Sequence, residues 1–184
     1  MKDLDEPVLL VPYDDAWPSR YEQERARIAS AFGVIPRSGL IQHIGSTAVP
    51  GLISKPVIDI MLGVGKWPAP DPFITRMGLI GYENLGEAGI PGRIYLRRRD
   101  LHSFNAHLVL RGGEHWTNNL ALRDLLRSDA GARERYATAK KAALELGRGR
   151  LLAYSSAKQS IVSDLLAVAR AAEALRKSPP VKHT

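Results

Sequence analysis

The residues best suited to do chemistry lie between positions 41 and 60, where a turn of small residues precedes an acid. Gly45 would let the backbone approach a ligand closely, and Ser46 and Thr47 add hydroxyl groups at a turn whose N–H groups favour phosphate. Asp59 lies in the apolar run Val-Ile-Asp-Ile-Met-Leu, where burial penalises an unpaired charge. The stretch therefore predicts an anion site beside an acid that needs a cation or a proton partner, although Asp59 could instead cap a neighbouring loop.

Basic residues near this stretch could supply positive charge to the same site. Lys55 lies in the loop between the turn and the acid, and Pro56 holds it in an extended geometry. Arg93, Arg97 and Arg99 alternate along an expected strand and its turn. They could present a row of guanidinium groups to an anion, or they could protect an exposed strand edge with charge.

Histidines and tyrosine–lysine pairs are further candidates, each with a packing alternative. His107 could ligate a metal or act as a base, and His43 is expected in the same neighbourhood. A buried histidine with satisfied hydrogen bonds fits both positions equally well. Two tyrosine–lysine pairs, each four residues apart on an expected helix, could line a common cleft or pack ring against stem. They are Tyr136 with Lys140 and Tyr154 with Lys158.

Hydrophobic periodicity indicates which elements hold these residues. Strands are expected at residues 39–44, 57–64, 82–85, 93–97 and 103–110, with a turn at 98–100. Helices are expected at residues 17–32, 73–79, 115–127, 130–146 and 154–176. This order predicts an α+β fold, in which a sheet domain over residues 1–113 is backed, within the same unit, by a helical C-terminal section over residues 114–176. The tail, residues 177–184, is expected to be disordered.

Composition places the chain among ordinary globular proteins. Its 184 residues are 45% hydrophobic and 24% charged, which suits one domain with a sizeable core. The chain has no cysteine, which excludes disulfides and thiolate metal sites. It shows no signal-peptide pattern and no apolar run of membrane-spanning length, so we expect a cytoplasmic protein without a membrane partner. The sequence does not indicate an oligomeric state.

Charge is unevenly spread along the chain. Residues 1–60 hold 6 Lys and Arg against 8 Asp and Glu, whereas residues 61–184 hold 20 against 11. A basic C-terminal part suits an anionic partner such as a nucleotide, a coenzyme phosphate or RNA. RNA is the least favoured of these, because the 3 Phe, 3 Trp and 6 Tyr are too few and are not interleaved with the basic residues.

Familiar phosphate and metal motifs are missing from the sequence. Residues 45–55 lack the Gly-Lys-Ser/Thr ending of a P-loop, and no Gly-x-Gly-x-x-Gly is present. The five histidines do not show the His-Glu-x-x-His spacing of a zinc protease. These motifs therefore do not account for the turn and the acid.

Residues 43–59, His-Ile-Gly-Ser-Thr-Ala-Val-Pro-Gly-Leu-Ile-Ser-Lys-Pro-Val-Ile-Asp, resemble the signature of the GrpB family. The likeness continues at residues 81–83, 90–93, 105–109 and 120–126 and at both tyrosine–lysine pairs, so it covers about residues 8–170. That family is also found fused behind bacterial dephospho-CoA kinases. The resemblance implies a nucleotidyltransferase-like fold with a mixed β-sheet.

For the site, the resemblance implies a phosphate-binding turn followed by a metal-binding acid. Gly45 and Ser46 would hold the phosphates of a nucleotide. Asp59 would bind the Mg²⁺ or Mn²⁺ used for phosphoryl transfer. His107, which could be a base or a metal ligand on the same expected sheet, is the other predicted catalytic residue. The remaining expected ligand contacts are Thr47, Lys55, Arg93, Asn105, Tyr136 and Lys140.

The sequence departs from the nucleotidyltransferase pattern at two acids. The partner of Asp59 should stand two residues later, where the chain has Met61, and the third acid, expected near Asn105 or His107, is missing. Mg²⁺ prefers oxygen ligands, so a single carboxylate is a poor two-metal site. Two functions are left open. One is binding of a nucleotide or phosphorylated coenzyme with nucleotidyl transfer, and the other is a non-catalytic binding or accessory module with a degenerate site.

Overall fold

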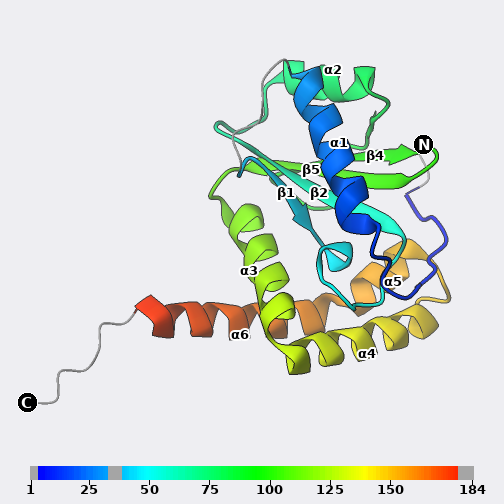
Figure 1. Ribbon diagram of the computed structural model, residues 1–184, viewed down its shortest axis with the longest axis vertical. Helices are drawn as coiled ribbons and strands as arrows, with labels where there is room; N and C mark the ends of the chain where they lie inside the picture. The colour runs from blue at the N-terminus through cyan, green and yellow to red at the C-terminus, as the bar shows by residue number, and fades with distance from the viewer. Residues whose placement is uncertain (1–3, 33–38, 178–184) are drawn as a thin grey trace, which may run out of the picture.

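The sheet is built around two apolar strands, β2 (Val57–Val64) and β5 (Ser103–Leu110), which pair in parallel. The other strands are β1 (Ile41–Ile44), β3 (Glu83–Asn84) and β4 (Arg93–Arg99). They pair antiparallel with their neighbours and give the order β1-β2-β5-β4-β3 (Figure 1). This computed structural model describes residues 4–32 and 39–177, with side chains described to residue 173. The predicted α+β class with a mixed sheet is confirmed, and the tail expected at 177–184 lies, apart from its first residue, outside the described residues.

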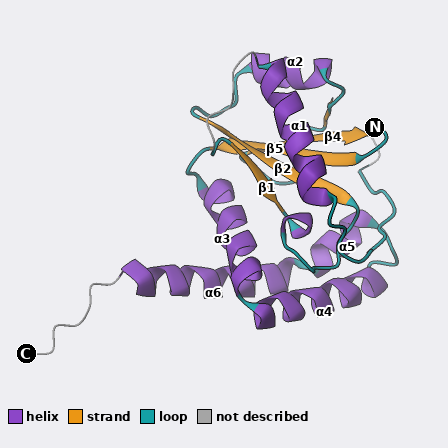
Figure 2. Cartoon of the chain, viewed as in Figure 1, coloured by secondary structure: helices purple, strands orange, loops and turns teal. Residues whose placement is uncertain are grey.

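One face of the sheet is covered by α1 (Trp17–Ala31) and α2 (Asp71–Leu79), as Figures 1 and 2 show. Alternate residues of β2 point to this face, because side chains in a strand alternate between its two sides. Ile58, Ile60 and Leu62 are buried there against residues of both helices. Since burial of a large aliphatic side chain stabilises a fold by about 1.5–3 kcal/mol, this face supplies the main core.

The opposite face of the sheet meets the C-terminal helices. These are α3 (Glu114–Ser128), α4 (Ala130–Leu146), α5 (Leu151–Ala157) and α6 (Gln159–Lys177). Trp116 of α3 packs on Met61 and Val109 of the sheet. Val49 and Leu52, which follow the turn at residues 45–48, pack in a separate cluster with residues of α3, α4 and α6. The turn is therefore held between the sheet and the helical section.

Most predicted elements agree with the structure to within two residues at each end, and two regions differ in a way that matters for the site. β4 continues to Arg99 instead of turning at residue 98, because Arg98 and Arg99 pair with Phe104 and Ser103 of β5. The helix predicted at 154–176 is two helices, α5 and α6, and α5 begins earlier, at Leu151. The side chain of Asp5 accepts the N–H of Leu152 at 2.9 Å, so a residue far away in the sequence caps this helix start.

Membrane insertion through a helix finds no support in the fold. None of the helices among the described residues combines the length and the apolar character needed to cross a bilayer.

Candidate functional site

The ten residues predicted for the site surround one cavity of about 300 Å³. The cavity lies between the face of the sheet that carries Asp59 and the helices α4 and α5. The predicted residues that line it are Gly45, Ser46, Thr47, Lys55, Asp59, Arg93, Asn105, His107, Tyr136 and Lys140. Asp59 lies on β2, Asn105 on β5 and Arg93 on β4. The register of these strands places the three side chains on the same face of the sheet, because side chains in a strand alternate between its two faces.

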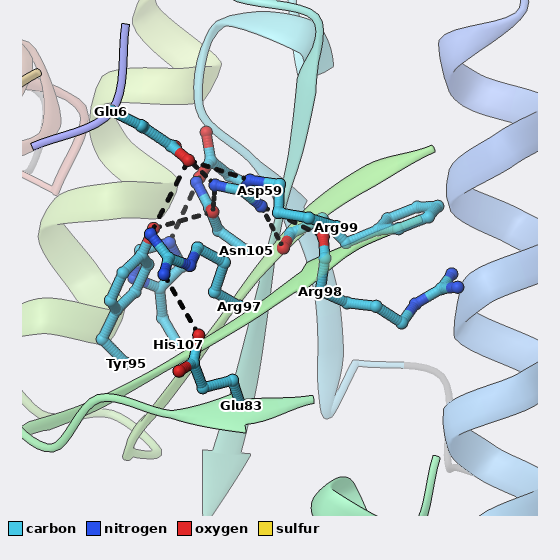
Figure 3. Close-up of polar contacts among 10 residues, drawn as sticks. Glu6, Asp59, Glu83, Tyr95, Arg97, Arg98, Arg99, Asn105 and His107 are labelled. Atoms are coloured by element: carbon cyan, nitrogen blue, oxygen red, sulfur yellow. Dashed lines mark hydrogen bonds and ion pairs between the residues drawn. The ribbon is translucent and has the colours of Figure 1, made fainter. Parts of the chain in front are cut away.

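Asp59 is held by hydrogen bonds on one carboxylate oxygen and by close packing on the other. Asn105 Nδ2 donates to Asp59 Oδ1 at 2.7 Å, and His107 Nε2 lies 3.3 Å from the same oxygen (Figure 3). Asp59 Oδ2 lies against Gly45, where a Cβ atom would come within 2.5 Å of it. Burial acts to raise the pKa of Asp59, but the hydrogen bond and charge of His107, together with Lys55 and Asn105, hold it well below its usual range. Asp59 is therefore an anion at neutral pH.

Asn105 positions Asp59 rather than offering a free amide to a ligand. Its Oδ1 atom accepts hydrogen bonds from the Tyr95 hydroxyl at 2.7 Å and from Arg99 Nη2 at 3.0 Å. Because both of these partners are donors, the amide nitrogen must face the carboxylate. The side chain is buried, with a relative exposure of 4%. Asn105 was predicted as a ligand contact. The structure places it at the cavity, but its amide oxygen and nitrogen are already hydrogen-bonded to Tyr95, Arg99 and Asp59.

Of the three arginines on β4 that were predicted to face an anion, Arg93 lines the cavity, whereas Arg97 and Arg99 form ion pairs. Arg99 Nη2 lies 2.6 Å from a carboxylate oxygen of Glu6, and Arg97 pairs with Glu83 at 3.1 Å (Figure 3). Neither of them lines the cavity. Arg93 does line it and donates through Nη2 to the carbonyl of Glu87 at 3.1 Å. Its Nε atom is buried without a hydrogen-bond partner among the described residues.

Three lysines from three parts of the chain line the cavity: Lys55 before β2, Lys140 on α4 and Lys158 between α5 and α6. Lys140 is 1% exposed and donates to the carbonyl of Ile53. Burial, assisted by the charges of the other two lysines, lowers the pKa of Lys140 to about 6. Burial likewise lowers the pKa of Lys158 to about 8 and also lowers that of Lys55. Asp59 opposes all three of these shifts.

The two tyrosine–lysine pairs satisfy both alternatives. Within each pair the lysine lies over the tyrosine ring, and both pairs line the cavity. Lys140 Nζ lies 5.7 Å from the ring centroid of Tyr136, and Lys158 Nζ lies 4.3 Å from that of Tyr154. The hydroxyl of Tyr136 is hydrogen-bonded to Ser46. The α4 helix is thereby connected to the turn that begins the predicted phosphate site.

The turn itself combines a left-handed glycine with a short 3₁₀ helix over Ser46–Ala48. Gly45 has φ of 70°, a conformation that favours glycine. The hydroxyl of Thr47 lies 3.0 Å from His43 Nε2 and is buried, so this group is engaged away from a ligand. His43 stacks on Tyr21 at 4.6 Å, and burial lowers its pKa to about 4. His43 is therefore a neutral packing residue and does not line the cavity.

The donors at this site do not suit the metal ions that the resemblance implies. Met61, at the position of a second acid, is fully buried against Val109 and Trp116 and does not line the cavity. Across residues 4–32 and 39–173, no group of three or more His, Asp or Glu side chains could hold an ion. Among the described residues that line the cavity, three are lysines and Asp59 supplies the one carboxylate. A pair of Mg²⁺ or Mn²⁺ ions requires more oxygen ligands than these residues provide.

The lining residue Tyr95 was not among the predicted candidates, and Tyr154 and Lys158 were predicted only as a pair that could line a cleft. Tyr95 stands two residues after Arg93 on β4 and therefore shares its face of the sheet, so the strand pattern could have predicted it. The first residues of α5, Leu151 and Leu152, also line the cavity, together with Leu4 of the N-terminal segment. No local pattern brings Leu4 to this place.

The sequence comparison with known families is decisive. Residues 7–167 match the family described as GrpB protein. The chain belongs to the GrpB family.

Curated relatives include proteins of similar and of greater length. UPF0157 protein SCO7215 from Streptomyces coelicolor is 34% identical over 91% of this chain and 86% of its own length. UPF0157 protein YqkA from Bacillus subtilis is 32% identical over 73% of this chain, but the match spans only 39% of that protein. A dephospho-CoA kinase from Mycolicibacterium paratuberculosis is 28% identical over 83% of this chain and 44% of its own length. Some relatives thus contain this unit within a longer protein.

Solved structures agree with the family. The crystal structure of GrpB from Enterococcus faecalis aligns with a TM-score of 0.75, at 27% identity, over 88% of this GrpB-family chain and 96% of that one. A more distant likeness, with a TM-score of 0.46 and 19% identity over 79% of this chain and 49% of that one, is to the Cid1 poly(U) polymerase. At that level the likeness says nothing about chemistry.

Proposed function

We propose that this GrpB-family protein binds a phosphorylated small molecule, a nucleotide or a phosphorylated coenzyme, in the cavity beside Asp59. The observation that carries this proposal is the charge around the cavity. Lys55, Lys140, Lys158 and Arg93 line it together with the single carboxylate of Asp59. A concave site with an excess of one charge concentrates ligands of the opposite charge.

Hydrogen-bonding groups at the cavity suit the same ligand class. The Ser46 and Tyr154 hydroxyls belong to lining residues, and the buried Nε of Arg93 has no partner within the described part of the chain. A volume of about 300 Å³ lies at the lower end of the range of roughly 300–1,000 Å³ that is usual for ligand sites. The cavity therefore suits the phosphorylated end of a coenzyme better than a whole dinucleotide.

Binding, rather than metal-dependent nucleotidyl transfer, is the function that these residues support. Transfer by two metal ions needs a set of carboxylates that the cavity does not provide. The similarity to a dephospho-CoA kinase supports including coenzyme A precursors among the candidate ligands.

Isothermal titration calorimetry with a small panel of compounds tests this proposal. The panel contains ATP, AMP, dephospho-coenzyme A and 4′-phosphopantetheine, each with Mg²⁺ and with EDTA, and adenosine and pantetheine as unphosphorylated controls. We expect at least one phosphorylated compound to bind and its unphosphorylated counterpart to bind at least tenfold more weakly. Lys55→Met should weaken binding, whereas Lys141→Met, which removes an exposed lysine on α4, should not. Failure of every phosphorylated compound to bind would refute the proposal.

A further inference from the structure

We propose that Lys55, Lys140 and Lys158 take the place of metal ions in this site and bind a phosphate dianion without a divalent cation. The inference rests on the proposed function and specifies the ligand group as a phosphomonoester. The three lysines line the same cavity from separate parts of the chain. Burial, together with the charges of Lys158 and Lys55, lowers the pKa of Lys140. With the three lysines protonated, the carboxylate of Asp59 and one phosphate dianion would offset their charges, and Arg93 adds a further positive group at the cavity.

Asp59 alone supplies too few oxygen ligands for a pair of divalent cations. Its Oδ1 atom already accepts a hydrogen bond from Asn105 and contacts His107, and its Oδ2 atom lies against Gly45. Lysine ammonium groups, in contrast, bind phosphate as compact point charges and need no metal bridge. The charge of Asp59 favours the protonated forms of all three lysines.

A buried tyrosine hydroxyl gives an independent indication of a ligand. Tyr154 is 1% exposed and lines the cavity, yet its hydroxyl has no hydrogen-bond partner in residues 4–32 or 39–173. Buried polar groups in native proteins almost always have a partner. Lys158 Nζ lies over the ring of Tyr154. A phosphate bound by this lysine would therefore lie close to the Tyr154 hydroxyl, which could donate a hydrogen bond to it.

Protonation of the lysines should be coupled to binding. Burial lowers the pKa of Lys140 to about 6 and that of Lys158 to about 8, so Lys140 is mostly neutral at pH 7.5 in the free protein. A bound dianion favours the charged forms, and the protein should therefore take up protons as it binds. The titratable and charged groups that line the cavity with Lys140 are Lys55, Asp59, Arg93, Tyr95, His107, Tyr136, Tyr154 and Lys158.

Calorimetry at pH 7.5 with EDTA tests the inference, using AMP and 4′-phosphopantetheine as phosphomonoester probes and cyclic AMP as a diester with one charge. Repeating each titration in buffers with different ionisation enthalpies measures the protons exchanged. We expect at least one phosphomonoester to bind equally well with EDTA and with Mg²⁺ and to take up protons. Cyclic AMP should bind at least tenfold more weakly than AMP if AMP is the ligand.

Variants identify the groups responsible. Lys158→Met should weaken binding of the phosphomonoester at least tenfold and reduce proton uptake, and Tyr154→Phe should weaken it severalfold. Lys141→Met, with the same loss of charge outside the cavity, should change it less than twofold. If phosphorylated compounds bind only with Mg²⁺, or without proton uptake, the inference is wrong and the proposed function stands. If none binds under either condition, the proposed function itself fails.

Discussion

The carboxylate of Asp59 lies directly against Gly45, so closely that a methyl group at residue 45 would come within 2.5 Å of Asp59 Oδ2. The turn and the acid, which lie on neighbouring segments of the chain, are thus in contact. Any side chain at residue 45 would displace either the turn or the acid. This contact makes Gly45 a test of how the cavity wall is assembled.

Gly45→Ala should destabilise the protein by roughly 2–4 kcal/mol, because it combines a left-handed backbone with the clash on Asp59. Gly51→Ala is a matched control, since Gly51 has φ of 76° but open space around the added methyl group. It should cost only the backbone strain, about 1–2 kcal/mol. Urea unfolding of both variants provides the comparison. Equal losses for the two variants would show that the contact with Asp59 is unimportant.

Asn105→Asp should create the pair of acids that the cavity lacks. The new carboxylate would stand 2.7 Å from Asp59 in place of the donor that now bonds to it, and like charges at this distance repel. We expect a loss of stability at pH 7, of the order of 1–3 kcal/mol, that Mn²⁺ partly restores.

Met61→Asp is the contrasting variant. Met61 is fully buried in the apolar cluster around Trp116, so an acid there should destabilise the protein without adding Mn²⁺ affinity. Thermal unfolding with and without Mn²⁺ distinguishes the two variants. Mn²⁺ stabilisation of Met61→Asp, but not of Asn105→Asp, would contradict this arrangement of the site.

The charge of Asp59 should stabilise the protein except in acid. Its pKa is lowered in the folded state, so its contribution is present above the unfolded value of about 4 and is lost as the pH falls below it. Asp59→Asn should therefore flatten the fall in stability between about pH 4 and pH 2. Urea midpoints over this range measure the effect, with Asp164→Asn on the exposed side of α6 as the control. Parallel curves for wild type and Asp59→Asn would refute this prediction.

Lys140 should make stability depend on pH in neutral and alkaline solution. Its folded pKa of about 6 lies far below the unfolded value of about 10.4, so the unfolded chain binds more protons between these values. Stability of the wild type should consequently rise with pH from about 6 to about 10. Lys140→Met should show a smaller rise, and Lys141→Met should follow the wild type. An unchanged slope in Lys140→Met would indicate that the lysine is charged in the free protein.

Tyr154→Phe should stabilise the free protein while it weakens ligand binding. The hydroxyl is buried without a partner in the described chain, so its removal should raise the free energy of unfolding by about 1 kcal/mol. Tyr136→Phe should instead lower stability, because the Tyr136 hydroxyl is bonded to Ser46. Differential scanning calorimetry of the two variants without ligand checks both signs. A loss of stability in Tyr154→Phe would mean that this hydroxyl has a partner in the free protein.

The sequence could predict the strands that carry Asp59 and His107, because their apolar runs are long and bounded by turn residues. It also indicated the turn at Gly45, where glycine has a conformational role that local sequence reveals. Contacts over long sequence separations were not predictable in this way. The capping of α5 by Asp5 and the ion pair between Glu6 and Arg99 join opposite parts of the chain.

The sequence also could not predict which neighbours each side chain of the site would bond to or pack against. Asn105 looked like a ligand contact, but Tyr95 and Arg99 fix its orientation toward Asp59. Met61 was expected on the face of the acid, and it is covered by Trp116 of a helix whose packing the strand pattern does not specify. Such details depend on which neighbours the fold supplies, and these come from distant segments.

A crystal structure of the protein grown with a saturating concentration of the tightest phosphorylated compound in the panel tests the central claim most directly. Anomalous scattering can locate phosphorus independently of the rest of the ligand. We predict a phosphorus atom inside the cavity, within hydrogen-bonding range of the Lys158 ammonium group and the Tyr154 hydroxyl through its oxygens. Phosphorus bound only elsewhere on the protein, with this cavity empty, would contradict the claim.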